Sequence, residues 1–209
     1  MWEKKIILTR SCHRPELPQQ RAGVLSLTIG VVLLSVARNL LARRWPGEMT
    51  AVQVPSYGLL LLATLLAAWY ARLGARDLGL SWGRFKLRLG GALVLTVVLA
   101  APGLMHGVSA LAAVVAVPGA LAVATIEELL FRGVLYTLWL RIAGTGSAIV
   151  LTSLAFAATH AFLYPLPVIL LGLLAGLLLA SWRALANDLV APMLAHTAAD
   201  AIALAVLRY

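Results

Sequence analysis

Three charged residues, Glu127, Glu128 and Arg132, interrupt an apolar stretch that is otherwise long enough to cross a membrane. Each ionised side chain at the centre of a membrane helix costs roughly 2.5–3.5 kcal/mol, so these charges need partners. Glu128 and Arg132 are four residues apart and therefore lie on one helical face, where they can pair. Glu127 points about 100° away from Glu128 and has no cation on its own helix. The spacing thus predicts one neutralised carboxylate and one that is free to act on a different face.

Two histidines and another carboxylate, His160, His196 and Asp200, are the other strongly polar residues that we identify in apolar runs. His196 and Asp200 are again four apart, so one helix directs an imidazole and a carboxylate at the same partner. At about 1.5 Å rise per residue, Glu127, His160 and His196 each lie roughly 10–20 Å along their predicted helices and can meet near the membrane midplane. Together with Asp200 they are of the types that activate a water or hold a metal. A proton path or a purely structural polar network would use the same types.

The elements that must position these side chains are membrane helices. The chain is 62% apolar and 12% charged, and its mean hydropathy is +0.94, which indicates a polytopic integral membrane protein. We predict an all-α bundle of about seven transmembrane helices, each of spanning length, at residues 22–41, 54–71, 89–105, 118–140, 147–162, 166–182 and 189–207. Pro118 favours a helix start. Three interpretations of residues 107–117 stay open: they extend the third helix, form a short membrane-embedded segment, or belong to the fourth helix.

The charge distribution bears on orientation and on partners. There are 17 lysines and arginines against 8 aspartates and glutamates, but most of the basic residues lie in the tail and in loops, so we exclude a nucleic-acid partner. The loop 72–88 holds five basic residues against Asp77 alone, which favours a cytoplasmic loop and a cytoplasmic N-terminus. Arg43 and Arg44 in the first loop argue the other way. We expect an integral protein of the plasma membrane, bacterial in our interpretation, with the lipid bilayer as its surroundings.

The domain organisation follows from the same pattern. Residues 1–21 are interpreted as a basic N-terminal tail and residues 22–209 as a single transmembrane helical domain. The tail lacks the compact order of a signal peptide, so the first span is expected to act as the targeting signal. The single cysteine, Cys12, excludes an intrachain disulfide and a multi-cysteine metal site.

Three ordered motifs resemble those of the CAAX-protease and bacteriocin-processing (CPBP) family of intramembrane proteases, also called the ABI family or type II CAAX prenyl endopeptidases: Glu127-Glu128-x-x-x-Arg132, Phe156-x-x-x-His160 and His196-x-x-x-Asp200. The resemblance covers roughly residues 107–207. It implies an endopeptidase whose partner is a protein or peptide with a membrane-proximal cleavage site, and it implies that Glu128 and Arg132 order the site. The short catalytic core is also similar to exosortase-like and myxosortase-like members of the family.

The same resemblance implies the catalytic roles. Glu127, assisted by His160, would take a proton from water, while His196 and the Asp200 position would stabilise the tetrahedral intermediate. The family usually has Asn at the last of these positions. Because ionised Asp cannot donate a hydrogen bond to an oxyanion, Asp200 must be protonated, orient His196 or bind a metal.

Two alternatives stay open at this point. Family members are often described as metalloproteases, which would make Glu127, His160, His196 and Asp200 candidate ligands of a divalent metal such as zinc. We prefer a mechanism that requires no cofactor, because only two histidines and carboxylates are on offer and no His-Glu-x-x-His motif places them. The second alternative is a non-catalytic membrane binding or immunity protein, or a small proton-coupled carrier. A carrier should show inverted repeats, and we find none in the sequence.

Overall fold

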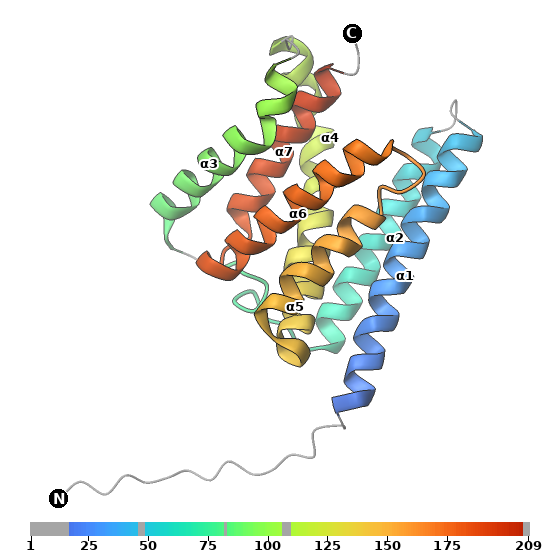
Figure 1. Cartoon of the computed structure of the whole chain (residues 1–209), viewed down its shortest axis with the longest axis vertical. Coiled ribbons are helices and arrows are strands. Elements are labelled where there is room, and N and C mark those ends of the chain that lie inside the picture. Colours follow the sequence, from blue (N-terminus) through green and yellow to red (C-terminus); the bar gives the residue numbers. More distant parts are fainter. Residues whose placement is uncertain (1–16, 46–48, 82, 106–109, 207–209) are drawn as a thin grey trace, which may run out of the picture.

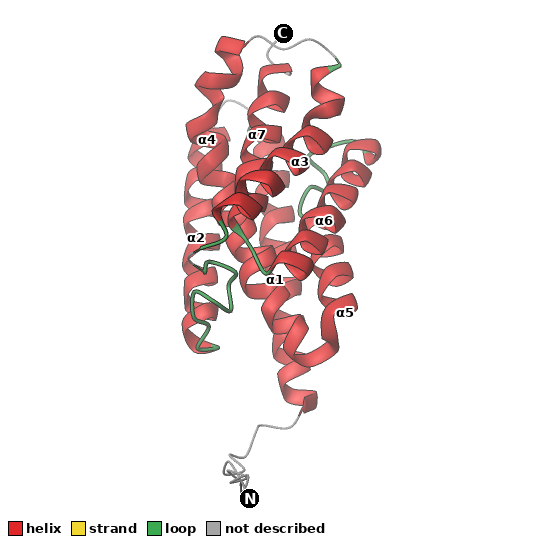
Figure 2. Ribbon diagram, turned by 90° about the vertical axis from the view of Figure 1, so that its left-hand side faces the viewer, coloured by secondary structure: helices red, strands yellow, loops and turns green. Residues whose placement is uncertain are grey.

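The protein folds as an all-α bundle, as predicted. The computed structural model describes residues 17–45, 49–81, 83–105 and 110–206, and Figures 1 and 2 show helices joined by loops throughout these ranges. In chain order the elements are α1 (Leu17–Arg44), α2 (Met49–Tyr70), α3 (Phe85–Leu104), α4 (Ala110–Glu128), the π-helical segment η2 (Leu129–Leu135), α5 (Tyr136–Ala158), α6 (Leu166–Ala186) and α7 (Val190–Val206). Cys12, Trp82 and His106 lie outside the described residues.

Four helices in the described part of the chain are long and apolar enough to cross a membrane: Gln19–Arg44, Ala51–Tyr70, Leu111–Ala158 and Leu166–Ala186. Val190–Val206 is apolar but shorter. The chain therefore has the helices of an integral membrane protein, whereas the predicted number of about seven spans is not shown by this measure. Many leucines on these helices face outward, as expected of surfaces that contact lipid.

Two predicted helix boundaries are wrong. Pro118 does not start a helix but lies inside α4, so residues 110–117 belong to the fourth helix. Membrane helices tolerate an internal proline, since neighbouring groups satisfy the carbonyl that it frees. The predicted helix 147–162 ends earlier, because α5 stops at Ala158 and a turn follows.

The apolar run Leu111–Ala158 is 48 residues long, and its chain changes direction at Gly144. A straight helix of this length would measure about 70 Å, more than twice the hydrocarbon thickness of a bilayer. Gly144 has φ 81° and ψ 176°, a backbone conformation that glycine adopts at no steric cost. In Figure 1 the ribbon of α5 turns back at its lower end. Gly144 thus divides this apolar run into two helical arms, although its length and composition alone would describe it as one helix.

The packing brings α4, α5 and α7 together around η2. In both ribbon views α7 lies between α3 and α4, and small residues such as Ala120 and Ala201 line the contact between α4 and α7. The largest apolar cluster joins α1, α2, η2 and α5, and it contains Leu130, Phe131 and Leu135, each at most 2% exposed. The motif that carries Glu127 and Glu128 therefore leads into the largest of these apolar clusters.

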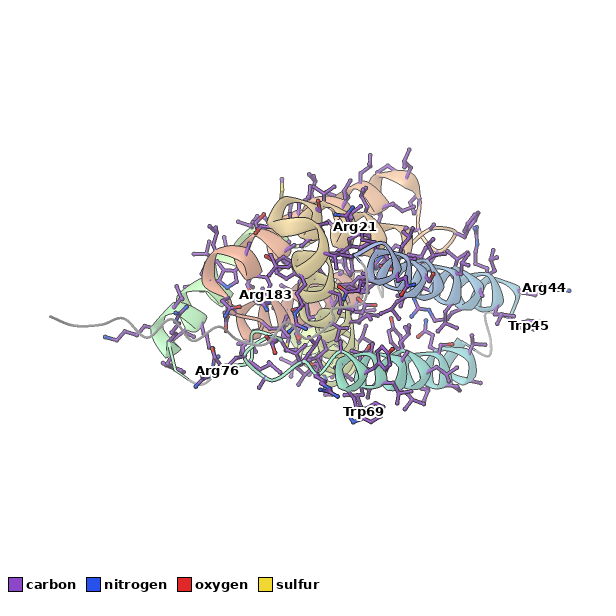
Figure 3. All side chains as sticks on the ribbon, turned by 90° about the horizontal axis from the view of Figure 1, so that it is seen from below. Arg21, Arg44, Trp45, Trp69, Arg76 and Arg183 are labelled. Atoms are coloured by element: carbon purple, nitrogen blue, oxygen red, sulfur yellow. The ribbon has the colours of Figure 1, made fainter. Side chains whose placement is uncertain are left out.

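One end of the bundle gathers basic residues from several helices. Figure 3 views this end from below, with Arg21, Arg76 and Arg183 labelled. Part of this charge is structural, because Arg88 pairs with Asp188 at 2.7 Å and the buried Arg183 donates from Nη2 to the carbonyl of Asp77 at 2.6 Å. The basic loop predicted to face the cytoplasm is therefore fixed to α6 and to the link between α6 and α7.

Candidate active site

The helix that presents the two glutamates winds more widely just after them. The segment η2 is π-helical. At its end the N–H of Tyr136 donates to the carbonyl of Phe131, which lies five residues earlier in the chain. Two side chains satisfy carbonyls of this segment: Arg183 Nε donates to Arg132 O at 3.1 Å, and Thr137 Oγ1 donates to Gly133 O at 2.7 Å. Wide turns of this kind occur frequently at functional sites.

Glu128 forms the centre of a buried polar cluster with Arg132 and His196. The predicted ion pair is confirmed, because Arg132 Nη1 donates to Glu128 Oε1 at 2.8 Å, with both side chains fully buried. The same oxygen lies 2.9 Å from His196 Nδ1, so a proton on Nδ1 is donated to Glu128. The guanidinium also lies 4.3 Å from the centre of the Phe156 ring. Glu128 therefore fixes the orientation of the imidazole as well as neutralising Arg132.

Glu127 faces the other nitrogen of the same imidazole. Its side chain is 9% exposed, and Oε2 lies 3.8 Å from His196 Nε2. Its other oxygen, Oε1, accepts a hydrogen bond of 3.1 Å from the hydroxyl of Tyr57 on α2. Asp200 Oδ2 also lies 3.5 Å from His196 Nε2, and this carboxylate is partly exposed. His196 is thus surrounded by three carboxylates, of which only Glu128 is within hydrogen-bonding distance.

His160 lies beside this cluster rather than in it. It follows the end of α5 in a turn, and its Nδ1 is 2.9 Å from the carbonyl of Phe156. The Phe156 ring contacts both imidazoles, with centroids 4.9 Å from His160 and 5.6 Å from His196. Within the described ranges His160 makes no hydrogen bond to Glu127, His196 or Asp200. The structure therefore brings five of the six predicted site residues into contact and leaves the sixth across an aromatic ring.

The arrangement does not fit a bound metal ion. No three His, Cys, Asp or Glu side chains among the described residues are grouped so that they could hold one. His160 Nδ1 faces a backbone carbonyl, and His196 Nδ1 faces Glu128. Glu127, His160, His196 and Asp200 are therefore not arranged as ligands of one ion in the part of the chain that the structure describes.

The sequence analysis missed the residues that α1 and α2 add to the site. Arg38 and Asn39 lie inside the predicted span 22–41, so the same rule that singled out the glutamates applied to them. Asn39 Nδ2 donates to the carbonyls of Thr159 and Ala161, at 2.7 and 3.1 Å. A side chain of α1 therefore holds the turn that contains His160.

Tyr57 gave a weaker signal. A tyrosine in an apolar helix is ordinary, and only the contact between α2 and α4 shows that its hydroxyl meets Glu127. The guanidinium of Arg38 lies over the Tyr57 ring, 4.6 Å from its centroid. α2 thus reaches the carboxylate that the motif left unpaired, and α1 contacts the tyrosine that does so.

Comparison with protein families matches residues 108–202 to the family described as Type II CAAX prenyl endopeptidase Rce1-like. Comparison with curated proteins and with solved structures finds no match. The matched segment contains all six predicted site residues. Arg38, Asn39 and Tyr57 lie outside it.

Proposed function

Because residues 108–202 form an Rce1-like type II CAAX prenyl endopeptidase domain, we propose that the chain is an intramembrane endopeptidase. Its substrate is a membrane-associated protein or peptide, cleaved at a bond close to the membrane. The observation that carries the proposal is the pair of atoms that face each other across 3.8 Å, Glu127 Oε2 and His196 Nε2. This separation is too long for a direct hydrogen bond and allows a water to lie within reach of both atoms.

In the proposed reaction Glu127 takes a proton from that water, and the resulting hydroxide attacks the carbonyl carbon of the substrate. His196, held by Glu128, carries a proton on Nε2 that stabilises the negative oxygen of the tetrahedral intermediate. The C–N bond then breaks, and Glu127 returns its proton to the leaving amine. His160 assists from the adjacent turn, and Asp200 supports His196. No metal takes part in this sequence.

We further propose that the bundle crosses the membrane about seven times, with the N-terminus in the cytoplasm. The reversal at Gly144 supports this number, because it divides Leu111–Ala158 into two arms of which each can run from one membrane face towards the other. The basic loop 72–88 supports the orientation, since cytoplasmic loops carry an excess of Lys and Arg.

The test is to incubate purified protein in lipid vesicles with candidate membrane-anchored precursors and to compare the wild type with Glu127→Gln. We expect the variant to lose on the order of 10²–10⁴ in rate, because it lacks the general base, while its thermal unfolding stays unchanged. Full activity of a folded Glu127→Gln protein would refute the catalytic assignment. Binding of a precursor without cleavage by the wild type would favour a non-catalytic binding or immunity protein instead.

A further inference from the structure

Arg38 is a buried cation that has no carboxylate partner among the residues that the structure describes. The residue is 8% exposed, and its Nε and Nη2 donate to Asn39 Oδ1 at 3.3 and 3.2 Å. The third nitrogen, Nη1, is buried and has no hydrogen-bond partner in the part of the chain that the structure describes. No carboxylate of those residues lies within ion-pair distance of it. Buried guanidinium groups are ordinarily paired, because an isolated buried charge is costly.

The guanidinium is also held in place. Asn39 accepts from it and is itself fixed through the carbonyls of Thr159 and Ala161, so the acceptor cannot rotate away without losing both bonds. The ring of Tyr57 covers one side of the cation at 4.6 Å. Arg132 provides the contrast within the same protein. It too has N–H groups without partners, but its charge is matched by Glu128 at 2.8 Å.

Arg38 lies close to the proposed general base, Glu127, with Tyr57 between them. Tyr57 contacts Arg38 through its ring and Glu127 through its hydroxyl, so a single phenol group separates the unpaired cation from the proposed general base. An extended peptide advances about 3.4 Å per residue, so a group bound at Arg38 lies within a few residues of a bond placed at Glu127.

We propose that Arg38 is a binding site for a carboxylate of the substrate. A guanidinium offers a planar fork of N–H donors that matches a carboxylate, and such charge-assisted bonds are among the stronger ones in proteins. The carboxylate comes either from the free C-terminus of the substrate or from an Asp or Glu side chain near the cleaved bond. The inference rests on the proposed function, since it assigns Arg38 to the substrate of that reaction.

Binding to inactive protein tests the proposal independently of cleavage. Full-length Glu127→Gln protein in lipid nanodiscs is titrated with three dansyl-labelled peptides of the sequence Ala-Leu-Val-Ala-Leu-Ala. The first ends in a free carboxylate, the second in an amide, and the third in an amide with one internal Leu replaced by Glu. Arg38→Gln is compared on the same background, with Arg44→Gln as the matched control, because Arg44 is an exposed arginine on the same helix. Thermal unfolding is recorded for each protein.

We expect at least one carboxylate peptide to bind about 10- to 100-fold more tightly than the neutral peptide. Arg38→Gln should abolish that preference and Arg44→Gln should keep it. A preference for the free C-terminus identifies one source, and a preference for the internal Glu identifies the other. Arg38→Lys, which keeps the charge but not the fork, serves if Arg38→Gln does not fold and should retain only part of the preference.

Equal binding of all three peptides, no binding of any, or an acid preference that survives in Arg38→Gln would overturn the proposal. None of these results bears on the proposed function, which depends on whether the wild type cleaves a precursor and Glu127→Gln does not.

Discussion

Two buried polar clusters contact Glu127, and the arginine in each has different partners. In the Glu128 cluster, formed with Arg132 and His196, the cation contacts a carboxylate at 2.8 Å. In the Arg38 cluster, formed with Asn39 and Tyr57, the cation donates to an amide oxygen and lies over an aromatic ring, and no carboxylate of the described residues is within ion-pair distance of it. The Glu128 cluster lies wholly within the matched residues 108–202, and the Arg38 cluster lies wholly outside them. The difference suggests that a paired charge fixes the shape of a site, whereas an unpaired one is available to a ligand.

The largest expected effect comes from breaking the paired cluster. Arg132→Met removes the cation that pairs with the buried Glu128 and leaves that carboxylate with His196 alone. Breaking a buried ion pair on one side typically costs about 3–5 kcal/mol. We therefore expect a lower free energy of unfolding in detergent together with loss of activity. Adding Glu128→Gln to the same protein should restore part of the stability. If Arg132→Met unfolds like the wild type and is merely slow, Arg132 contacts the substrate and does not hold the fold.

A smaller effect is expected where the two clusters meet. Tyr57→Phe removes the hydroxyl that donates to Glu127 Oε1 at 3.1 Å, while the ring that covers Arg38 remains. Because one hydrogen bond to a charged group is lost, kcat should fall about tenfold with KM and thermal unfolding unchanged. A rise in KM at constant kcat would show that Tyr57 binds substrate and does not position Glu127.

A substitution of Asp200 tests whether His196 requires the partly exposed carboxylate beside its Nε2. Asp200→Asn should preserve or raise the cleavage rate near neutral pH, because an amide can donate to an oxyanion at this position. The rate should also be the same with and without a chelator. An inactive Asp200→Asn protein, combined with a metal whose removal abolishes wild-type activity, would replace the metal-free mechanism with a metal-dependent one.

The smallest effect on stability is expected from Arg38→Met, the counterpart of Arg132→Met. The substitution removes an unpaired buried charge but leaves Asn39 Oδ1 without its donor, so the two contributions oppose each other. We expect the free energy of unfolding to change by less than about 1.5 kcal/mol in either direction. A loss as large as that of Arg132→Met would mean that Arg38 has a structural partner and that the two clusters are alike.

Periodicity was sufficient for contacts within one helix. The pairing of Glu128 with Arg132 and the proximity of His196 to Asp200 both follow from a spacing of four residues, and both are observed. The apolar runs likewise gave the all-α class and the approximate position of each helix. These features depend on local sequence, which periodicity describes well.

Contacts between helices could not be obtained in this way. Nothing in the sequence of α2 indicates that the Tyr57 hydroxyl reaches α4, because that contact depends on how the two helices pack. The turn that holds His160 was predicted as helix, since the run through residue 162 is apolar and the capping bonds come from Asn39 on a distant segment. Arg38 and Asn39 were detectable by the rule on polar residues in apolar runs.

The wide turn η2 bears on how chains of this kind can change in length. In an α-helix, deleting one residue rotates everything beyond it by about 100° and turns buried faces outward. A π-helical turn contains one residue more than an α-helical one, so a deletion between 129 and 135 can be absorbed by narrower winding. The helices that follow would keep their faces, and a deletion before Arg132 would change its spacing from Glu128 from four residues to three. When related sequences are aligned, a single-residue gap between Glu128 and Arg132 therefore signals a change in the site and not a different fold.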